Sequence, residues 1–235
     1  MERNSEQDSP APGSFAAQLD PPTWEALGRY GRPRTYPARA ALFHQGDPSR
    51  HVLILLAGWV KVTAVSRGGN EALLALRGPG DVLGELAAVD GGPRSATVTT
   101  LMPCRVQAVD GERFVEAVTQ LPDLALALIR HLANSLRESD GKRLEYVSST
   151  SSGRLAGLLL DLAARHGRHT ADGLVIELRL TQRELAAAAA TSREAVARAI
   201  RTLRQRDVIR TDRGRVIITQ PEVLRSLRPA RADDT

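Results

Sequence analysis

The sequence predicts an α+β protein with an N-terminal antiparallel β roll, a long pairing helix and a C-terminal winged helix-turn-helix. Three observations support this prediction. Short β-type segments separated by Gly-, Asn- and Pro-containing turns fill much of the first half of the chain. A leucine-rich helical stretch follows them. The last third then contains two short helical segments and a hairpin pattern, in the order typical of a winged helix-turn-helix.

The β-type segments lie in the first 120 residues. Residues 1–20 are polar and without periodicity, so we expect a disordered tail. A short helix is expected from Pro21 with Trp24 and Leu27 on its buried side, and we assign the roll to residues 21–120. Short strands at regular spacing favour an antiparallel roll over a parallel sheet. The strands are expected at residues 42–43, 52–56, 59–65, 72–76, 96–100 and 105–109.

A dimerisation helix is expected over residues 121–147. Its leucines form one stripe, which suits pairing with a second copy of the chain. The alternative is that the stripe packs on the chain's own roll. Helix formation is weakly specified after Arg137, because Gly141 costs about 1 kcal/mol in a helix interior. The stripe consists of Leu121, Leu124, Leu128, Leu132 and Leu136.

The C-terminal part carries the positive charge. Residues 148–152 (SSTSS) are expected to form a hinge, residues 153–228 a DNA-binding domain and residues 229–235 a tail. The chain carries a formal charge of +5, of which residues from Ser148 onward contribute +6 and the preceding ones −1. A basic C-terminal part is expected of a domain that neutralises DNA phosphates.

The helix-turn-helix is predicted from the stretch LTQRELAAAAATSREAVARAIRTLRQ. Thr181 is a good N-cap, and Glu184 completes a capping box before an alanine-rich run. Ser192 can cap the second helix, whose apolar residues fall on one face. Two short helices, a tight turn and a basic second helix are typical of this DNA-binding motif.

Base recognition is predicted at the start of the second helix. Guanine takes a bidentate Arg and cytosine donates to a carboxylate, so Arg193, Glu194 and Arg198 are suited to a major groove. A hairpin over residues 208–219 would form the wing, with Arg215 reaching a phosphate. The alternatives are a solvated surface helix or a winged helix that binds protein. The candidate DNA contacts are Thr181, Gln182, Ser192, Arg193, Glu194, Arg198 and Arg215.

Composition argues against other classes of protein. No charge-free apolar run of about 18 residues is present and no signal peptide begins the chain, so we expect a cytoplasmic protein without a membrane partner. Cys104 is the only cysteine and is expected to be a small core residue in a strand. The five histidines show no zinc-protease spacing, and no nucleophile motif is found, so we expect neither a metal site nor an enzyme.

A second motif lies in GDVLGELAAVDGGPRSATV, residues 80–98. A strand is expected to lead into a helical turn that begins near Gly84 and Leu86 and offers backbone N–H groups to an anion. Arg94 can fork onto a phosphate, Ser95 can donate to it, and Glu85 can accept from a ribose hydroxyl. The alternative is that Arg94 pairs with a nearby carboxylate, Asp90 or Glu85.

Together the motifs GELA…PRSATV and TSREAVARAI, separated by a long helix, resemble the Crp/Fnr family of bacterial transcription regulators. The resemblance runs from about Trp24 to Thr219. It implies a cyclic nucleotide effector, cAMP or cGMP, with Glu85 on the ribose and Arg94 and Ser95 on the cyclic phosphate. It also implies a homodimer that binds a palindrome of GTGA-type half-sites in double-stranded DNA and works with RNA polymerase.

Several positions depart from the family pattern. Family members that respond to cAMP contact the base with two polar residues of the dimer helix, and these positions hold Ser139 and Asp140 here. A carboxylate accepts from an amino group but repels a phosphate. The turn of the helix-turn-helix has Ala190 where glycine is usual, and the segment between Glu85 and Arg94 is about one residue shorter.

Because helix specification fails beside Ser139 and Asp140, we hypothesise a switch. Bound nucleotide would order the helix over residues 137–147 and so place the two recognition helices in successive major grooves. Two alternatives remain. In the first, the protein is a DNA-binding regulator that needs no ligand or responds to another effector. In the second, the roll is the regulatory module of a signalling enzyme.

Overall fold

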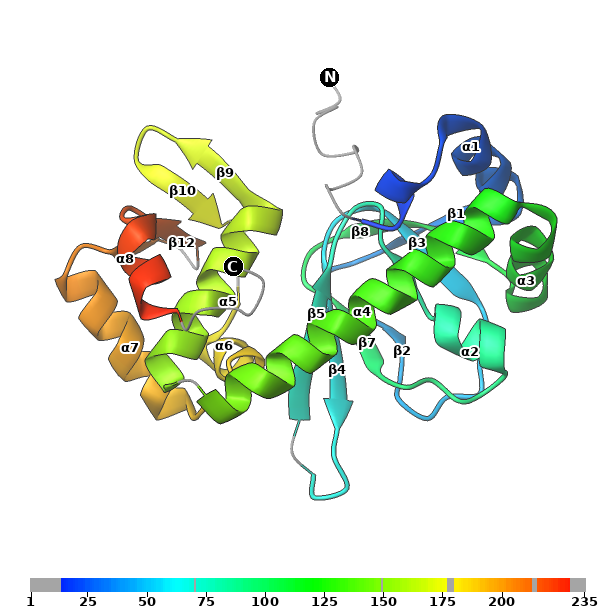
Figure 1. Cartoon of the computed structure of the whole chain (residues 1–235). Coiled ribbons are helices and arrows are strands. Elements are labelled where there is room, and N and C mark those ends of the chain that lie inside the picture. The colour runs from blue at the N-terminus through cyan, green and yellow to red at the C-terminus, as the bar shows by residue number, and fades with distance from the viewer. Residues whose placement is uncertain (1–13, 70, 149, 177–179, 213–214, 229–235) are drawn as a thin grey trace. The chain divides into compact units, whose positions relative to one another are not determined.

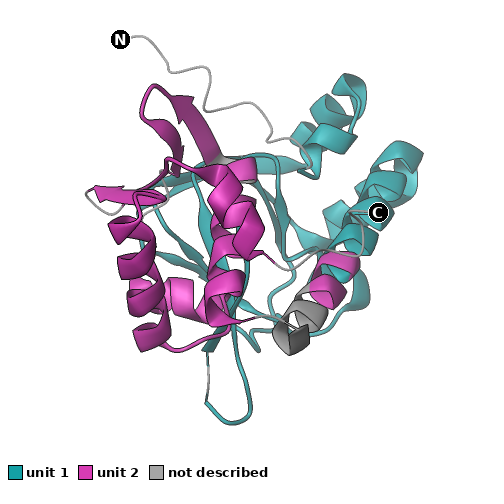
Figure 2. Cartoon of the chain, turned by 60° about the vertical axis from the view of Figure 1, so that its left-hand side comes forward, with its two compact units in different colours: residues 1–136 teal, residues 137–235 magenta. Residues whose placement is uncertain are grey.

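The structure is a computed structural model that describes residues 14–69, 71–148, 150–176, 180–212 and 215–228. The chain divides into two compact units, residues 1–136 and 137–235 (Figure 2). Each unit is described by itself below. Within the described residues, no helix combines the length and the apolar character needed to cross a bilayer.

The first unit contains the predicted antiparallel roll (Figure 1). Its strands form two four-stranded sheets, with orders β1-β8-β3-β6 and β2-β7-β4-β5, and every pairing is antiparallel. The strands are β1 (Gly31–Tyr36), β2 (Ala41–Phe43), β3 (Val52–Ala57), β4 (Val60–Val65), β5 (Glu71–Arg77), β6 (Val82–Leu83), β7 (Thr97–Thr100) and β8 (Cys104–Val109).

Strand β3 joins the two halves of the core. Its residues Val52, Leu53, Ile54 and Leu55 are all at most 1% exposed. Val52 and Ile54 pack with the helices of the unit, whereas the other two pack between the sheets. Both faces of this strand are therefore buried, which explains why its sequence is continuously apolar and does not alternate.

Helices cover one side of this core: α1 (Pro21–Arg29), the short α2 (Glu85–Asp90), α3 (Gly111–Gln120) and the first part of α4 (Pro122–Ser148). A 3₁₀ turn at Ala16–Gln18 precedes them. Phe15 is fully buried and meets the His131 ring edge-on, with ring centroids 5.9 Å apart. The expectation of a disordered tail over residues 1–20 is therefore wrong for residues 14–20, because a buried aromatic ring holds them to the core; residues 1–13 lie outside the described residues.

The first part of the leucine stripe on α4 faces the core of the first unit. Leu124 is fully buried and Leu128 is 4% exposed, and both belong to the core of the roll. The alternative, packing on the chain's own roll, is thus correct for these leucines. The end of the stripe and the positions beside it are exposed: Leu136 of the stripe is 63% exposed, and Leu126 and Ile129 are 43% and 62% exposed.

The second unit contains the predicted winged helix-turn-helix. Its helices are α5 (Ser151–His166), α6 (Gln182–Ala188), α7 (Arg193–Gln205) and α8 (Pro221–Leu227). Its small antiparallel sheet has the order β11-β12-β10-β9, with β9 (Gly167–Thr170), β10 (Gly173–Ile176), β11 (Ile209–Asp212) and β12 (Arg215–Ile218). Strands β11 and β12 form the predicted wing, whereas β9 and α8 were not expected.

Candidate nucleic-acid interface and effector cassette

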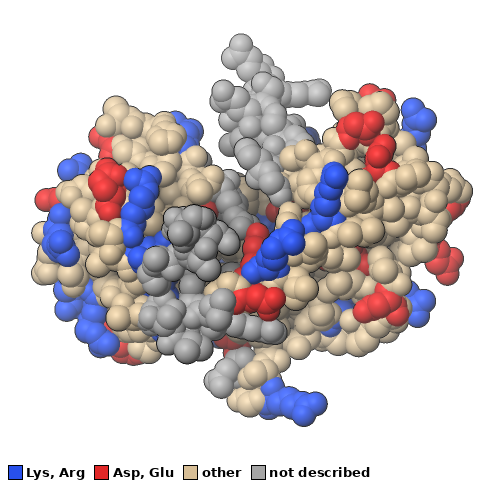
Figure 3. All heavy atoms as spheres, in the orientation of Figure 1, with Lys and Arg blue, Asp and Glu red and all other residues tan. Residues whose placement is uncertain are grey.

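Helix α7 separates an apolar from a polar face. Val196 and Leu203 are 1% and 4% exposed and face the core of the unit. Arg193, Glu194 and Arg198 are exposed near its start. Figure 3 shows basic side chains gathered over the part of the surface where α7 lies in Figure 1. The helix thus presents the three predicted base-reading residues to solvent on one side.

The start of α7 is capped by Ser192. Its hydroxyl accepts from the Ala195 N–H at 3.1 Å, as the sequence predicts. The backbone N–H of Glu194 and the Ser192 hydroxyl also lower the pKa of the Glu194 carboxyl, and the charges of Arg193 and Arg198 act in the same direction. Glu194 is therefore an ionised acceptor at neutral pH, as a contact to a cytosine amino group requires.

Helix α6 begins with the predicted capping box. The Thr181 N–H donates to Glu184 Oε2 at 2.8 Å, and the Glu184 N–H donates to Thr181 Oγ1 at 3.2 Å. Gln182, the first residue of the helix, is exposed. The box fixes the backbone at the start of α6, where Thr181 and Gln182 are candidate DNA contacts.

The turn between α6 and α7 contains a left-handed alanine. Ala190 has φ of 42°, and the Thr191 N–H donates to the Ala186 carbonyl at 3.0 Å across it. This is the Schellman arrangement, in which glycine is the usual left-handed residue. Ala190 therefore carries the strain that its departure from the family pattern implies.

Two further residues hold this turn. Arg154 of α5 donates from Nε to the Ala189 carbonyl at 2.8 Å and from Nη2 to the Ala190 carbonyl at 3.2 Å. Ser151 Oγ accepts from Thr191 Oγ1 at 2.9 Å. The sequence analysis missed both residues, since nothing in the local pattern shows that the start of α5 reaches a turn 35 residues away.

In the wing, Arg215 pairs with Asp212. Arg215 Nη2 lies 3.2 Å from Asp212 Oδ2, and the two side chains are 39% and 55% exposed. An ion pair between two side chains this exposed to water has a small free energy of interaction. A DNA phosphate can therefore compete with Asp212 for the guanidinium.

The second motif, residues 80–98, lies in the first unit, and we call it the effector cassette after the ligand that the family resemblance implies. Gly84 has φ of 81° and immediately precedes α2. A Cβ at this position would lie 2.2 Å from Arg94 Nη1, so the approach of the arginine requires glycine. Leu86 and Ser95 are exposed. The structure thus brings Gly84 and Arg94 into direct contact.

The protein itself binds the guanidinium of Arg94. Arg94 is 3% exposed; its Nε donates to Ser49 Oγ at 3.0 Å, its Nη1 to the Gly84 carbonyl at 2.9 Å and its Nη2 to the His51 carbonyl. The same group stacks over the Phe43 ring, 4.0 Å from its centroid. These partners replace the carboxylates of Asp90 and Glu85 that the alternative interpretation expected. Ser49 and His51 lie 45 and 43 residues from Arg94 in the sequence, so the local pattern did not predict these two partners.

The carboxyl of Glu85 lies in a poorly solvated position. Burial raises its pKa, and the charges of Arg77 and Arg94 oppose that shift only in part. A carboxylate that has lost water in this way gains from a hydroxyl donor. The environment is therefore suited to the ribose contact that the family resemblance implies for Glu85.

The two α4 residues of the predicted pocket, Ser139 and Asp140, are exposed and belong to the second unit. The cassette belongs to the first unit, so these two residues and the cassette lie in different units. Their contact with a nucleotide stays a prediction.

Cys104 is a core residue, as predicted. It is 3% exposed at the start of β8, and burial raises the pKa of its thiol to about 11. Among the residues that the structure describes, no group of three or more His, Cys, Asp or Glu side chains is placed to hold a metal ion.

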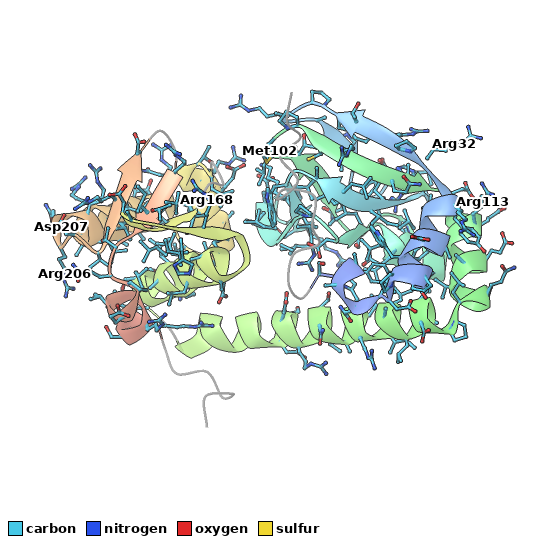
Figure 4. The ribbon with its side chains drawn as sticks, turned by 90° about the horizontal axis from the view of Figure 1, so that it is seen from above. Arg32, Met102, Arg113, Arg168, Arg206 and Asp207 are labelled. Carbon is cyan, nitrogen blue, oxygen red and sulfur yellow. The ribbon has the colours of Figure 1, made fainter. Side chains whose placement is uncertain are left out.

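A basic groove lies elsewhere on the roll. We call it the basic groove, and it is lined by Tyr30, Arg32, Arg34, His51, Ala108, Val109, Asp110 and Arg113. Figure 4 shows Arg32 and Arg113 projecting from the same end of the roll. Burial and the nearby Arg94 and Arg34 lower the pKa of His51, so arginines supply the positive charge at neutral pH.

Comparison with known proteins agrees with both halves of this description. Residues 33–120 match the cyclic nucleotide-binding domain and residues 153–227 match the Crp-like helix-turn-helix domain. The CRP-like cAMP-activated global transcriptional regulator of Mycobacterium tuberculosis is 31% identical over 206 residues, 88% of this chain and 92% of that relative. The Cyclic AMP receptor protein of Thermus thermophilus is 32% identical over 199 residues, 84% of this chain and 88% of that relative.

A solved structure shows the same fold. FixK2 from Bradyrhizobium japonicum matches with a TM-score of 0.75 at 20% identity, over 86% of this chain and 99% of that one. At this identity the likeness concerns the fold alone.

Proposed function

The chain belongs to the Crp/Fnr family of DNA-binding transcription regulators, and we propose that it reads DNA through Arg193, Glu194 and Arg198 of α7. The family consists of regulators and not of enzymes. The observation that carries the proposal is the exposed, capped start of α7, with an ionised carboxylate between two arginines. Such a set matches guanine and cytosine edges in a major groove. Thr181, Gln182, Ser192 and Arg215 are assigned to the flanking phosphates.

A homodimer is the second part of the proposal. Leu126, Ile129 and Leu136 lie on one face of α4 and are exposed, which supports pairing of two α4 helices through this face. Two recognition helices related by a two-fold axis would bind a palindrome whose half-sites lie about one helical turn apart.

The DNA part is tested by fluorescence anisotropy with a GTGA-type palindrome and a scrambled duplex, each at several salt concentrations. We expect tighter binding to the palindrome and a linear fall of log affinity with log salt. Equal affinity for the two duplexes would contradict base reading by this helix. A flat salt dependence would favour the protein-binding alternative.

A cyclic nucleotide, cAMP or cGMP, is the proposed effector. Gly84, Glu85, Leu86, Arg94 and Ser95 would hold it, with Ser139 and Asp140 as further contacts. The support is the match to the cyclic nucleotide-binding domain, the desolvated Glu85, and two relatives whose names specify activation by cAMP or its reception.

One observation favours the ligand-independent alternative. The guanidinium of Arg94 already donates to Ser49, Gly84 and His51, so a phosphate has to replace these contacts. A ligand shifts such an equilibrium only by its difference in affinity for the two states. Isothermal titration with cAMP, cGMP and a non-cyclic control, AMP, separates the two cases. We expect heat of binding with cAMP or cGMP and none with AMP. If none of the three nucleotides gives heat, the ligand-independent alternative holds.

RNA polymerase is the proposed protein partner. The basic groove supports this, because its three arginines suit an acidic protein surface. Transcription in vitro from a promoter that carries the palindrome is the test. We expect a change in transcript level, and an unchanged level with the operator fully occupied would contradict the proposal.

A further inference from the structure

The end of α6 leaves two carbonyl groups in need of partners. The helix ends at Ala188, its C-cap is Ala189, and the left-handed Ala190 follows. The last carbonyls of a helix have no partner within it and carry its negative dipole end. The Thr191 N–H donates to the Ala186 carbonyl, while the carbonyls of Ala189 and Ala190 accept from a side chain of another helix.

Arg154 bonds both of these carbonyls with one side chain. Its Nε and Nη2 lie 2.8 and 3.2 Å from the two oxygens. The guanidinium is planar and its N–H groups have fixed directions, so two bonds determine where the turn lies relative to α5. The Thr191–Ser151 hydroxyl bond, at 2.9 Å, adds a third contact between the same turn and the same helix end.

The start of α5 is itself a fixed platform. The Thr150 hydroxyl caps the helix by accepting from the Gly153 N–H at 3.2 Å. Leu155 and Ala156, which directly follow Arg154, are fully buried. The position of Arg154 is therefore set by the core of the unit and not by the turn that it holds.

The turn between α6 and α7 determines where α7, the proposed recognition helix, begins. Helix α7 begins at Arg193, two residues after Thr191, so a shift of the turn moves Arg193 and Glu194 with it. Hydrogen bonds to base edges need donor–acceptor distances within a few tenths of an ångström of 2.9 Å. A loosened turn therefore weakens base contacts more than phosphate contacts, which depend chiefly on charge.

We propose that Arg154 is a positioning residue for base recognition, which acts by locking the turn between α6 and α7 to the start of α5. The proposal rests on the proposed base-reading role of α7. It assigns no DNA contact to Arg154. Removing its side chain lowers specific affinity while leaving non-specific affinity almost unchanged.

The test uses the full chain and an operator that the wild-type protein selects from random-sequence duplexes. Arg154→Met removes both hydrogen bonds and keeps an unbranched apolar stem. Ser151→Ala removes one bond and no charge, and it keeps the test valid if Arg154→Met fails to fold. Arg225→Met is the matched control, because Arg225 lies on α8 in an exposed pair with Glu222. Affinities for the operator and a scrambled duplex are measured between about 50 and 200 mM salt, the range over which phosphate contacts change affinity strongly.

We expect Arg154→Met to bind the operator about tenfold more weakly, which corresponds to the loss of about one base contact, with the affinity for the scrambled duplex and the salt slope unchanged. Ser151→Ala should show a smaller loss of the same kind, and Arg225→Met none. Unchanged operator affinity in Arg154→Met and Ser151→Ala would overturn the proposal. So would an equal loss on both duplexes with a salt slope reduced by about 1, which is the mark of a phosphate contact. If the wild type selects no operator, base reading itself fails, and the Arg154 proposal fails with it.

Discussion

Arg94 Nη1 donates to the Gly84 carbonyl at 2.9 Å. The sequence assigns both residues to a phosphate site, and in the structure they form a hydrogen bond with each other. The contact exists because glycine leaves room for the guanidinium where a Cβ would clash. Arg94 therefore has two roles that compete: it holds the roll together, and it is the proposed phosphate ligand.

Arg94→Ala should destabilise the roll. The change leaves the carbonyls of Gly84 and His51 without a donor and removes the stacking on Phe43, which together cost about 1–3 kcal/mol. Thermal unfolding of the ligand-free protein measures this. Arg113→Ala is the control, since Arg113 is exposed, and its melting temperature should stay close to that of the wild type. An equal melting temperature for Arg94→Ala would show that the contacts of Arg94 do not stabilise the fold.

Glu85→Gln should stabilise the ligand-free protein in a pH-dependent way. Burial raises the pKa of Glu85 in the folded state, so its contribution to stability is present below the ordinary pKa of 4.5 and is lost as pH rises through the folded-state value. Glutamine has no charge to desolvate. The melting temperature of the variant should exceed that of the wild type at pH 7, with the difference shrinking towards pH 4. A difference that grows at acid pH would contradict this environment for Glu85.

Ala190→Gly should stabilise the helix-turn-helix. The left-handed conformation costs an alanine about 1 kcal/mol more than a glycine. We expect a higher free energy of unfolding for the second unit by urea denaturation. Ala187→Gly is the control, because Ala187 lies inside α6 and glycine should destabilise it there. Destabilisation by Ala190→Gly would mean that the turn is not strained.

Ile129→Glu should separate the proposed dimer without unfolding the roll. Ile129 is 62% exposed on α4, so a charge there costs little in the monomer but is buried when two copies pair. Sedimentation velocity should show a monomer for the variant and a dimer for the wild type. Leu128→Ala provides the contrast: Leu128 is a core residue, and the change should lower the free energy of unfolding by about 2–5 kcal/mol. A variant Ile129→Glu that still sediments as a dimer would place the pairing face elsewhere.

The local features of the sequence predicted the fold well. The capping box at Thr181, the Ser192 cap and the wing hairpin depend on residues a few positions apart, and the structure confirms all three. Strand β1 was missed because its charged and Pro-containing sequence suits an edge strand, which needs no apolar alternation. Leu124 and Leu128 were expected to pair with a second copy but pack in the core, because a helical stripe shows that side chains share a face and not what covers them.

The contacts of the two candidate sites were harder to predict. Two partners of Arg94, Ser49 and His51, lie in the segment that precedes β3, and Arg154 reaches a turn that follows another helix. Such partners are set by the tertiary fold, which periodicity does not specify. The motif residues themselves were found because their spacing is local.

The base-reading role of α7 is tested most directly by measuring affinity for a set of operators that each carry one changed base pair. Wild-type protein should lose about 1–3 kcal/mol at each contacted pair, and Arg193→Ala, Glu194→Ala and Arg198→Ala should each lose discrimination at one pair alone. If the triple alanine variant keeps the wild-type preference at every position, α7 does not read the sequence.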